Sequence, residues 1–269
     1  MTMRAFSLEG KVAVVTGALG LLGRHHCEAL SEAGANVVVC DLDGEKSQNL
    51  AQKLPVESMG AGMDVTAPGS IRTVLDQVLF KFGHVDVLIN NAAINDMFET
   101  PALAAERSKF ESYPLEMWQK LLDVNVTGVY LCSQIIGTQM AKQKKGSIIN
   151  IASTYGIVAP DQSLYCSPEG QQLFYKSPAY PTTKGAVIAF TRFLAAYWGR
   201  EGVRVNALSP GGVENGQERY FIAKYASKTP VGRMARPVDY KGAVVFLASD
   251  ASSYMTGANM VVDGGWTVW

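Results

Sequence analysis

The chain has 269 residues, of which 48% are hydrophobic, and its formal net charge at pH 7 is zero. This length and apolar content suit one α/β domain with a buried sheet, and we expect residues 1–269 to act as a single catalytic domain. The balanced charge offers no electrostatic footprint for nucleic acid or an acidic membrane surface, so the expected partner is a small-molecule substrate.

The first predicted strand, Val12–Val15, runs directly into a glycine-rich turn that opens a helical pattern. In a strand–turn–helix unit of this kind, Gly17 permits the tight turn, Gly20 lets the backbone approach a pyrophosphate, and Gly23 lets helix and strand pack closely. The amides at the helix N-terminus then bind phosphate oxygens. The pattern predicts a dinucleotide cradle, with a simple packing turn as the alternative.

The second predicted strand, Asn36–Cys40, is followed by Asp41, 18 residues beyond Gly23. A carboxylate at this place accepts hydrogen bonds from the adenosine ribose hydroxyls and repels a 2′-phosphate. No Arg or Lys follows until Lys46, so we expect NAD rather than NADP as the cofactor. The alternative is that Asp41 caps the next helix, a role for which Asp43 is the better candidate.

Strands and helices continue to alternate along the rest of the chain. Further strands are expected near Gly60–Met63, Val85–Asn90, Ser147–Ala152, Val203–Leu208 and Met260–Val262. Helices are expected near Ser70–Phe82, Pro114–Lys142, Ala179–Trp198 and Pro237–Ala248. Near-continuous apolar strands joined by helical crossovers predict a doubly wound parallel sheet of about seven strands with helices on both faces, which is a single-domain Rossmann fold.

Three long segments, Ile94–Tyr113, Thr154–Pro178 and Gly212–Arg236, are expected to be irregular. Each follows the carboxyl end of a predicted strand. Ligands of open parallel sheets bind at that edge, so these segments are the expected walls of a substrate site.

The segment Tyr180–Lys184 carries residues suited to acid/base chemistry. Tyr180 and Lys184 are four residues apart, so on a helix the phenol and the ammonium lie on the same face. Pro181 fits only the first turn of a helix, which places Tyr180 at the helix start. A phenol has a pKa of about 10 in water, and a neighbouring ammonium lowers it toward the range of a general base. A second pair with this spacing, Tyr220 and Lys224, lies in the last irregular segment, where we expect a lid residue rather than the reaction.

Taken in order, these and later motifs resemble those of the short-chain dehydrogenase/reductase family over nearly the whole chain. The matching segments are Thr16–Gly23, Asn90–Ala93, Asn125–Gly128, Ile149–Ser153, Tyr180–Lys184, Ser209–Gly212 and Met255–Gly265. The second of them departs from the family's N-N-A-G motif by ending in Ala. The resemblance implies an enzyme that passes a hydride between a substrate carbon and a nicotinamide.

The resemblance also implies four catalytic residues. Tyr180 would be the acid/base, and Ser153 would hydrogen-bond the substrate oxygen. Lys184 would lower the Tyr180 pKa and bind the ribose, while Asn125 would hold a water in the proton path. The implied cofactor contacts are Gly17, Leu19, Gly20, Leu22, Gly23, Asp41, Leu42, Asp64, Val65, Asn91, Ala92, Ala93, Tyr180, Lys184, Pro210, Gly211, Gly212 and Val213. The expected substrate contacts are Asn95, Ser153, Tyr155 and Tyr180.

Two departures narrow the expected substrate. The glycines at 17, 20 and 23 follow the form of the family's extended branch, which acts on nucleotide sugars, and the 27 residues from Ser153 to Tyr180 exceed the usual single-domain interval. Because Met255–Gly265 is single-domain in style and closes the chain, we expect a single-domain enzyme with an enlarged loop, Tyr155–Pro178. The polar content of this loop favours a hydroxyl-rich substrate over a steroid or fatty acyl chain; a subunit contact is the alternative. The chain most resembles bacterial members that act on sugars or polyols, including some linked to surface-sugar biosynthesis.

Three functions stay open at this point. The first is a reversible NAD-linked dehydrogenase of a sugar, polyol or related hydroxyl compound. The second is an epimerase or dehydratase that reduces bound NAD transiently, and the third is a non-catalytic dinucleotide sensor. Arg233 and Arg236 fit a structural turn better than a phosphate site. The apolar faces of Val124–Met140 and Val187–Trp198 imply, through the resemblance, a dimer or tetramer.

Cysteine and histidine usage favours a cytoplasmic protein. The four cysteines show no C-x-x-C spacing and are expected to be reduced packing residues, and the three histidines show no metal-ligand pattern. We expect no metal site. The N-terminal residues lack the apolar core of a signal peptide, and no apolar span approaches the ~20 residues of a membrane helix.

Overall fold

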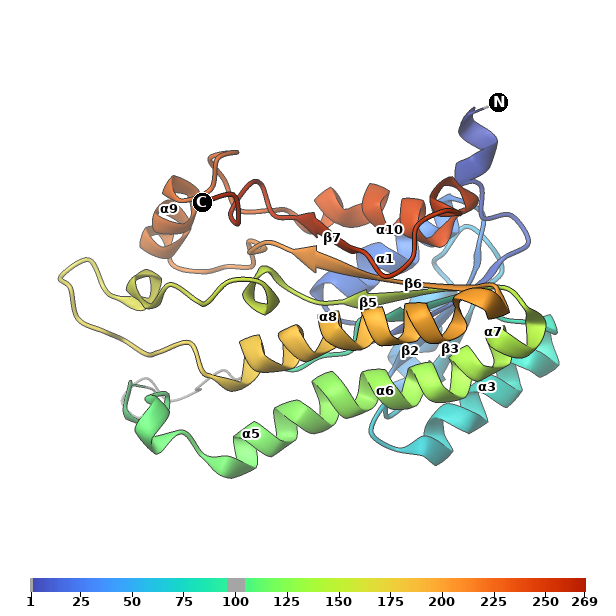
Figure 1. Cartoon of the computed structure of the whole chain (residues 1–269), viewed down its shortest axis with the longest axis horizontal. Coiled ribbons are helices and arrows are strands. Elements are labelled where there is room, and N and C mark those ends of the chain that lie inside the picture. Colours follow the sequence, from blue (N-terminus) through green and yellow to red (C-terminus); the bar gives the residue numbers. More distant parts are fainter. Residues whose placement is uncertain (1, 96–104) are drawn as a thin grey trace.

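Seven parallel strands form one sheet in the order β3–β2–β1–β4–β5–β6–β7 (Figure 1). The structure is a computed structural model and describes residues 2–95 and 105–269. The strands are β1 Val12–Thr16, β2 Asn36–Asp41, β3 Met59–Gly62, β4 Val87–Asn90, β5 Gly146–Ile151, β6 Val203–Pro210 and β7 Asn259–Val262. This arrangement confirms the predicted single-domain Rossmann fold.

Helices cover both faces of the sheet (Figure 1). One face carries α1 Leu21–Glu32, α2 Gly44–Ala51 and α10 Lys241–Ala248. The other carries α3 Pro68–Phe82, α5 Leu115–Leu122, α6 Gly128–Cys132, α7 Thr138–Gln143 and α8 Ala179–Trp198. A further helix, α9 Arg219–Ser227, lies beyond the end of the sheet toward which the strands point.

Alternate residues of each strand enter two separate cores. On β1, Val12 and Val14 pack toward α3 and α8, whereas Ala13 and Val15 pack toward α1 and α10. All four are at most 1% exposed. Burial on both faces explains why the strands read as continuous apolar runs rather than as alternating ones, and why they could be recognised in the sequence.

Three elements differ from the sequence-based expectation. The helix expected near Pro237–Ala248 is a 3₁₀ turn, Pro237–Tyr240, followed by α10. The segment Gly212–Arg236, expected to be irregular, contains α9; Tyr225 is its one buried residue, so apolar periodicity gives no helical signal there. The helix expected over Pro114–Lys142 is a run from Leu115 to Gln143 with two π-helical turns, at Asp123–Thr127 and Ser133–Gly137. Residues 96–104 of the first predicted loop lie outside the described part of the chain. Among the described helices, none combines the length and apolarity needed to cross a membrane.

A buried histidine makes the fold sensitive to acid. His26 on α1 is fully buried, and within residues 2–95 and 105–269 neither ring nitrogen has a hydrogen-bond partner. Burial, with a smaller contribution from His25, lowers the pKa of His26 from 6.5 to about 4. The unfolded chain therefore takes up a proton as the pH falls through about 6.5, while the folded protein takes it up only near pH 4. Stability is lost across this window, by about 3 kcal/mol in total.

The variant His26→Leu should remove this loss. Between about pH 6.5 and pH 4, the free energy of unfolding of the variant should fall by about 3 kcal/mol less than that of the wild type. The reason is that no buried imidazole then has to stay neutral. Chemical denaturation at fixed protein concentration over this pH range measures the effect. His25→Gln is the matched comparison: it removes only the smaller contribution, from a partly exposed side chain beside Glu28, and should keep most of the pH dependence. An unchanged pH dependence in His26→Leu would contradict the assignment.

Candidate active site

The glycine turn between β1 and α1 has a shape that only residues without side chains permit. A Cβ on Gly17, whose φ is +60°, would lie 2.6 Å from Ala92 Cα, and a Cβ on Gly23 would lie 2.2 Å from the Gly17 carbonyl oxygen. Gly20 is the residue before α1, and because it has no side chain, no capping hydrogen bond to the first amides of the helix is made there. The uncapped end of this 12-residue helix, with its partial positive charge, fits the pyrophosphate of a dinucleotide.

Asn91 braces this turn from the end of β4. Its Nδ2 donates to the carbonyl oxygens of Thr16 and Gly17 at 3.0 and 2.8 Å. Thr16 Oγ1 accepts in turn from the backbone N–H groups of Asn91 and Ala92. The predicted contacts Asn91, Ala92 and Ala93 therefore adjoin the glycine turn.

Asp41 ends β2 beside the same turn. Its Oδ2 accepts from the Leu19 N–H at 2.9 Å and its Oδ1 from the Leu42 N–H at 2.8 Å. A carboxylate has about four acceptor positions, so capacity remains for ribose hydroxyls. The cap of α2 is Asp43, which accepts from the Lys46 N–H at 3.0 Å. The structure thus gives the capping role to Asp43 and leaves Asp41 at the mouth of the cradle.

The other predicted cofactor contacts share this edge of the sheet. Leu19, Leu22 and Leu42 flank the turn and the end of β2, Asp64 and Val65 follow β3, and Pro210, Gly211, Gly212 and Val213 end β6 and follow it. Because all strands are parallel, their carboxyl ends meet at one edge, where open α/β sheets bind ligands.

Asn125 lies in the first π-helical turn and is fully buried. Its Oδ1 accepts from the Ile94 N–H at 2.8 Å, and its Nδ2 donates to the Ile94 carbonyl at 2.9 Å and to Thr183 Oγ1 at 3.2 Å. The side chain therefore joins the segment after β4 to α8. In this position it orders the backbone beside the predicted reaction site.

Lys184 ties α8 to the end of β5. Its ammonium is buried and donates to the Ile151 carbonyl at 2.7 Å, and burial lowers the pKa of Lys184 to about 8. One helical turn earlier, the Tyr180 ring centroid is 5.7 Å from this ammonium. Ser153 follows β5, and its Oγ accepts from the Tyr155 N–H at 3.1 Å. Ser153, Tyr180 and Lys184 therefore share the carboxyl end of β5.

A second ammonium stands over the Tyr180 ring. Lys176 Nζ is 4.7 Å from the ring centroid and donates to Asn95 Oδ1. Lys176 was not among the site residues predicted from the sequence. It precedes Tyr180 by four residues, as Tyr180 precedes Lys184, but it lies outside α8, so helical spacing could not reveal the contact.

Comparison with known proteins identifies the family. A family model described as enoyl-(acyl carrier protein) reductase matches residues 17–267. A D-threitol dehydrogenase of Mycolicibacterium smegmatis is 34% identical over 271 residues, covering 98% of this chain and 95% of the relative. The chain belongs to the short-chain dehydrogenase/reductase family. It is therefore an oxidoreductase of a family that acts on CH–OH groups with a nicotinamide dinucleotide.

Other members of the family show the range of similarity. An NAD-dependent glycerol dehydrogenase of Listeria innocua is 32% identical over 98% of this chain and 96% of its own length. A 3-alpha-(or 20-beta)-hydroxysteroid dehydrogenase of Mycobacterium bovis is 36% identical over 96% of this chain and 90% of its own length. The crystal structure of a gluconate 5-dehydrogenase from Burkholderia cenocepacia, in complex with NADP and tartrate, superposes with a TM-score of 0.87 at 29% identity, covering 100% of both chains.

Several polar side chains of the enlarged loop bond to other parts of the protein itself. Gln162 accepts from the Lys176 N–H and donates to its carbonyl, and Gln172 donates to the carbonyls of Gln162 and Phe174. Asp161 forms an ion pair with Lys228, the residue that follows α9. These three side chains hold the loop together, so their polarity does not argue for a hydroxyl-rich substrate. The preference for a hydroxyl-rich substrate therefore stays a prediction that has to rest on other residues.

Two further sequence features, the second Tyr–Lys pair and the arginines Arg233 and Arg236, make contacts within the protein itself. Lys224 of the second Tyr–Lys pair donates to the Cys166 carbonyl at 2.8 Å, which ties α9 to the enlarged loop. Arg233 pairs with Asp239 at 2.6 Å, and Asp239 also accepts from the Arg236 N–H at 2.8 Å. Both arginines therefore take part in the turn before α10, as the structural interpretation predicts.

Proposed function

We propose that this protein is an NAD-dependent dehydrogenase that reversibly oxidises a secondary alcohol of a sugar, a polyol or a related polar hydroxyl compound. The observation that carries the proposal is the meeting of Tyr180, the buried Lys184 ammonium and Ser153 at the end of β5, on the same sheet edge as the glycine cradle. Residues 1–269 would act as one NAD-binding catalytic domain.

The proposed cofactor site combines the cradle, Asp41 and the turn after β6. The pyrophosphate would lie at the start of α1 and the adenosine ribose at Asp41, while Lys184 would reach the nicotinamide ribose. When bound, NAD supplies the hydride acceptor. NAD rather than NADP is proposed on the strength of Asp41; the gluconate 5-dehydrogenase neighbour holds NADP, so this choice needs its own test.

The protein's part in the proposed reaction is proton transfer. Tyr180 Oη would take the proton of the substrate hydroxyl while Ser153 Oγ hydrogen-bonds the same oxygen. Cations favour the charged form of a phenol, so the ammonium groups of Lys184 and Lys176 both lower the cost of forming phenolate at Tyr180. Asn125 would order a water that returns the proton to solvent.

A polar substrate is proposed on the groups beside Tyr180. Lys176 and Asn95 offer a charged donor and an amide next to the ring, and Tyr155, whose hydroxyl lies 3.2 Å from that of Tyr165, follows Ser153 closely. Two of the relatives are named for D-threitol and glycerol and one for a hydroxysteroid. A panel of polyols, aldonates and hydroxysteroids with NAD, followed at the NADH absorbance band, separates these classes. Turnover of the steroids alone would overturn the polar assignment.

Replacing Lys176 by Met should weaken substrate use more than cofactor use. The substitution keeps a linear side chain but removes the ammonium over Tyr180, so we expect kcat/KM for the alcohol to fall about tenfold, the scale of one charge-assisted contact, while the KM for NAD stays within about twofold. Lys176→Arg should restore most of the activity. Equal changes in both KM values, or no change at all, would place Lys176 outside the site.

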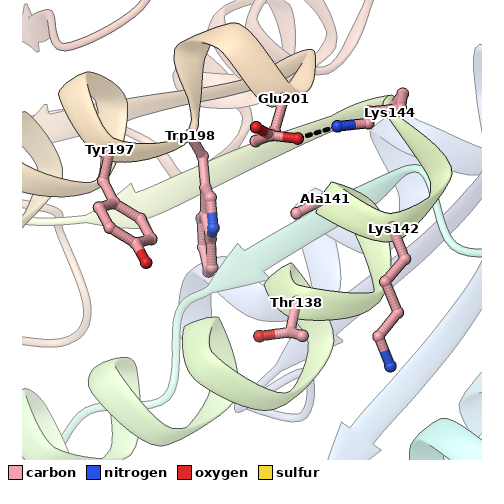
Figure 2. A pocket seen from close by; sticks show the side chains of 7 residues that line it. All are labelled: Thr138, Ala141, Lys142, Lys144, Tyr197, Trp198 and Glu201. Atoms are coloured by element: carbon pink, nitrogen blue, oxygen red, sulfur yellow. Dashed lines mark hydrogen bonds and ion pairs between the residues drawn. The ribbon is translucent and has the colours of Figure 1, made fainter.

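We also propose that the protein forms a homo-oligomer, because aromatic side chains of α8 are exposed at its surface. Phe193 and Tyr197 on α8 are 60% and 67% exposed and stack with ring centroids 5.8 Å apart. Next to them, an open groove of about 560 Å³ runs between α7 and the end of α8, with Trp198 and Thr138 among its lining residues (Figure 2). The Trp198 end of the groove lies about 27 Å along α8 from Tyr180, too far to hold the reacting alcohol. A second copy of the chain is the proposed partner of the exposed Phe193 and Tyr197 rings, and sedimentation velocity tests this proposal.

The proposed location is the cytoplasm. All four cysteines are free, and Cys27, Cys40 and Cys132 are buried in the cores. Burial raises the pKa of the Cys132 thiol to about 12 and that of Cys40 well above its usual value, so neither is a reactive thiolate. Their role is packing, as expected of a protein kept reduced.

A further inference from the structure

The turn after β6 adjoins the reaction site through the sheet. Leu208 of β6 pairs with Ile151 of β5, and the Ala152 N–H donates to the Leu208 carbonyl at 2.8 Å. Two residues past Leu208 the strand ends at Pro210 and the chain enters Gly211–Gly212. The cofactor site proposed above, on which this inference rests, includes this turn. Lys184, which would reach the nicotinamide ribose, is bonded to Ile151 on the neighbouring strand, so this turn would lie against the nicotinamide half of the cofactor.

Two buried tyrosines hold this turn through its backbone. The Gly212 N–H donates to Tyr225 Oη at 2.6 Å, and Tyr240 Oη donates to the Gly211 carbonyl at 3.3 Å. The Tyr225 ring tip lies directly on the glycine: a Cβ at 212 would be 2.5 Å from Tyr225 Cζ. The backbone at Gly212 therefore follows the position of the Tyr225 hydroxyl.

Tyr225 is itself fixed by aromatic packing. It is 3% exposed and stacks on Trp266 near the C-terminus, with ring centroids 4.2 Å apart and planes 10° from parallel. Its cluster also contains Leu164 and Tyr165 of the enlarged loop. Burial raises the pKa of Tyr225 well above its ordinary value, so the phenol stays neutral and acts as a hydrogen-bonding group only.

This cluster continues to the residues beside Ser153. Tyr165 contacts the ring of Phe221 on α9 at 5.7 Å, and its hydroxyl lies 3.2 Å from that of Tyr155. Lys224 on α9 and Lys228, which follows this helix, bind the loop at Cys166 and Asp161. Packed side chains thus connect the enlarged loop, α9 and the turn after β6.

We propose that Tyr225 is a positioning residue for the nicotinamide half of the cofactor. Its hydroxyl holds Gly212 so that the turn after β6 is ordered before the dinucleotide binds. The enlarged loop then serves this positioning by packing around Tyr225, which accounts for the internal use of its polar side chains.

Tyr225→Phe tests the proposal, because it deletes the hydroxyl and keeps the ring on Trp266. The affinity for NADH should fall about five- to tenfold, the scale of one lost buried hydrogen bond. The affinity for ADP-ribose, which lacks the nicotinamide, should stay within about twofold. Fluorescence titration for NADH and calorimetry for ADP-ribose measure the two dissociation constants. Tyr254→Phe, which removes a fully exposed phenol, is the control and should alter neither.

Equal losses for both ligands, or unchanged NADH affinity, would overturn the proposal. If Tyr225→Phe fails to fold, Trp266→Leu loosens the same ring and must give the same selective loss of NADH. Both readouts are binding constants and require no substrate. A protein that shows the selective loss but oxidises no polyol would therefore contradict the proposed function and leave the role of Tyr225 standing.

Discussion

Tyr180→Phe is expected to lower kcat by about 10³-fold, because a positioned acid/base group contributes on the order of 10²–10⁴ in rate. The substitution removes only the hydroxyl and leaves the ring beside Lys176 and Lys184. The dissociation constant for NADH should therefore stay within about twofold. Steady-state kinetics with the best polyol from the panel, together with fluorescence titration of NADH, measures both quantities.

The second Tyr–Lys pair provides the matched control. Tyr220→Phe removes a phenol with the same sequence spacing to a lysine, but Lys224 is bonded to the enlarged loop at the Cys166 carbonyl. This variant should keep most of the activity. The reverse result, a silent Tyr180→Phe and an inactive Tyr220→Phe, would move the reaction to α9.

The second large effect is expected in the choice of cofactor. The wild-type protein should favour NAD over NADP in kcat/KM by about 10²-fold or more, because juxtaposed like charges cost several kcal/mol. Asp41→Asn keeps an acceptor oxygen for the Leu19 or Leu42 amide but removes the charge that repels a 2′-phosphate. The preference of this variant for NAD over NADP, measured as the ratio of the two kcat/KM values, should therefore shrink at least about tenfold, mainly because kcat/KM for NADP rises.

Asp43→Asn is the control for this comparison. Asp43 lies two residues away and caps α2, and Asn is an equally good cap, so the ratio of the two cofactors should not change. A wild-type preference for NADP would remove Asp41 from its proposed role. The same conclusion would follow if the ratio of the two kcat/KM values changed in Asp43→Asn and not in Asp41→Asn.

Most of the framework could be predicted from the sequence because its signals are local. Parallel strands buried on both faces leave unbroken apolar runs, and α8 has the predicted bounds, Ala179–Trp198, because Pro181 marks its first turn. The strand ends then place Asp41, Ser153 and the turn after β6 on one edge. Parallel topology alone requires this.

The parts that could not be predicted depend on contacts between distant segments. α9 buries Tyr225 against Leu164 and Trp266, so its own sequence carries no helical period. Lys176 reaches Tyr180 through the conformation of the enlarged loop. In that loop, Gln162 and Gln172 have the polarity of a substrate site, but the structure shows them bonded to the loop's own backbone.

The most direct measurement of the central claim is the stoichiometry of NADH to oxidised product for the best polyol substrate under multiple turnovers. A dehydrogenase that uses NAD as a co-substrate releases equal amounts of NADH and of the ketone or aldehyde, and this is the result we predict. Loss of substrate with formation of an isomer or a dehydrated product, and no accumulation of NADH, would contradict the account. That outcome would show that the cradle and Tyr180 serve an epimerase or dehydratase with transiently reduced NAD.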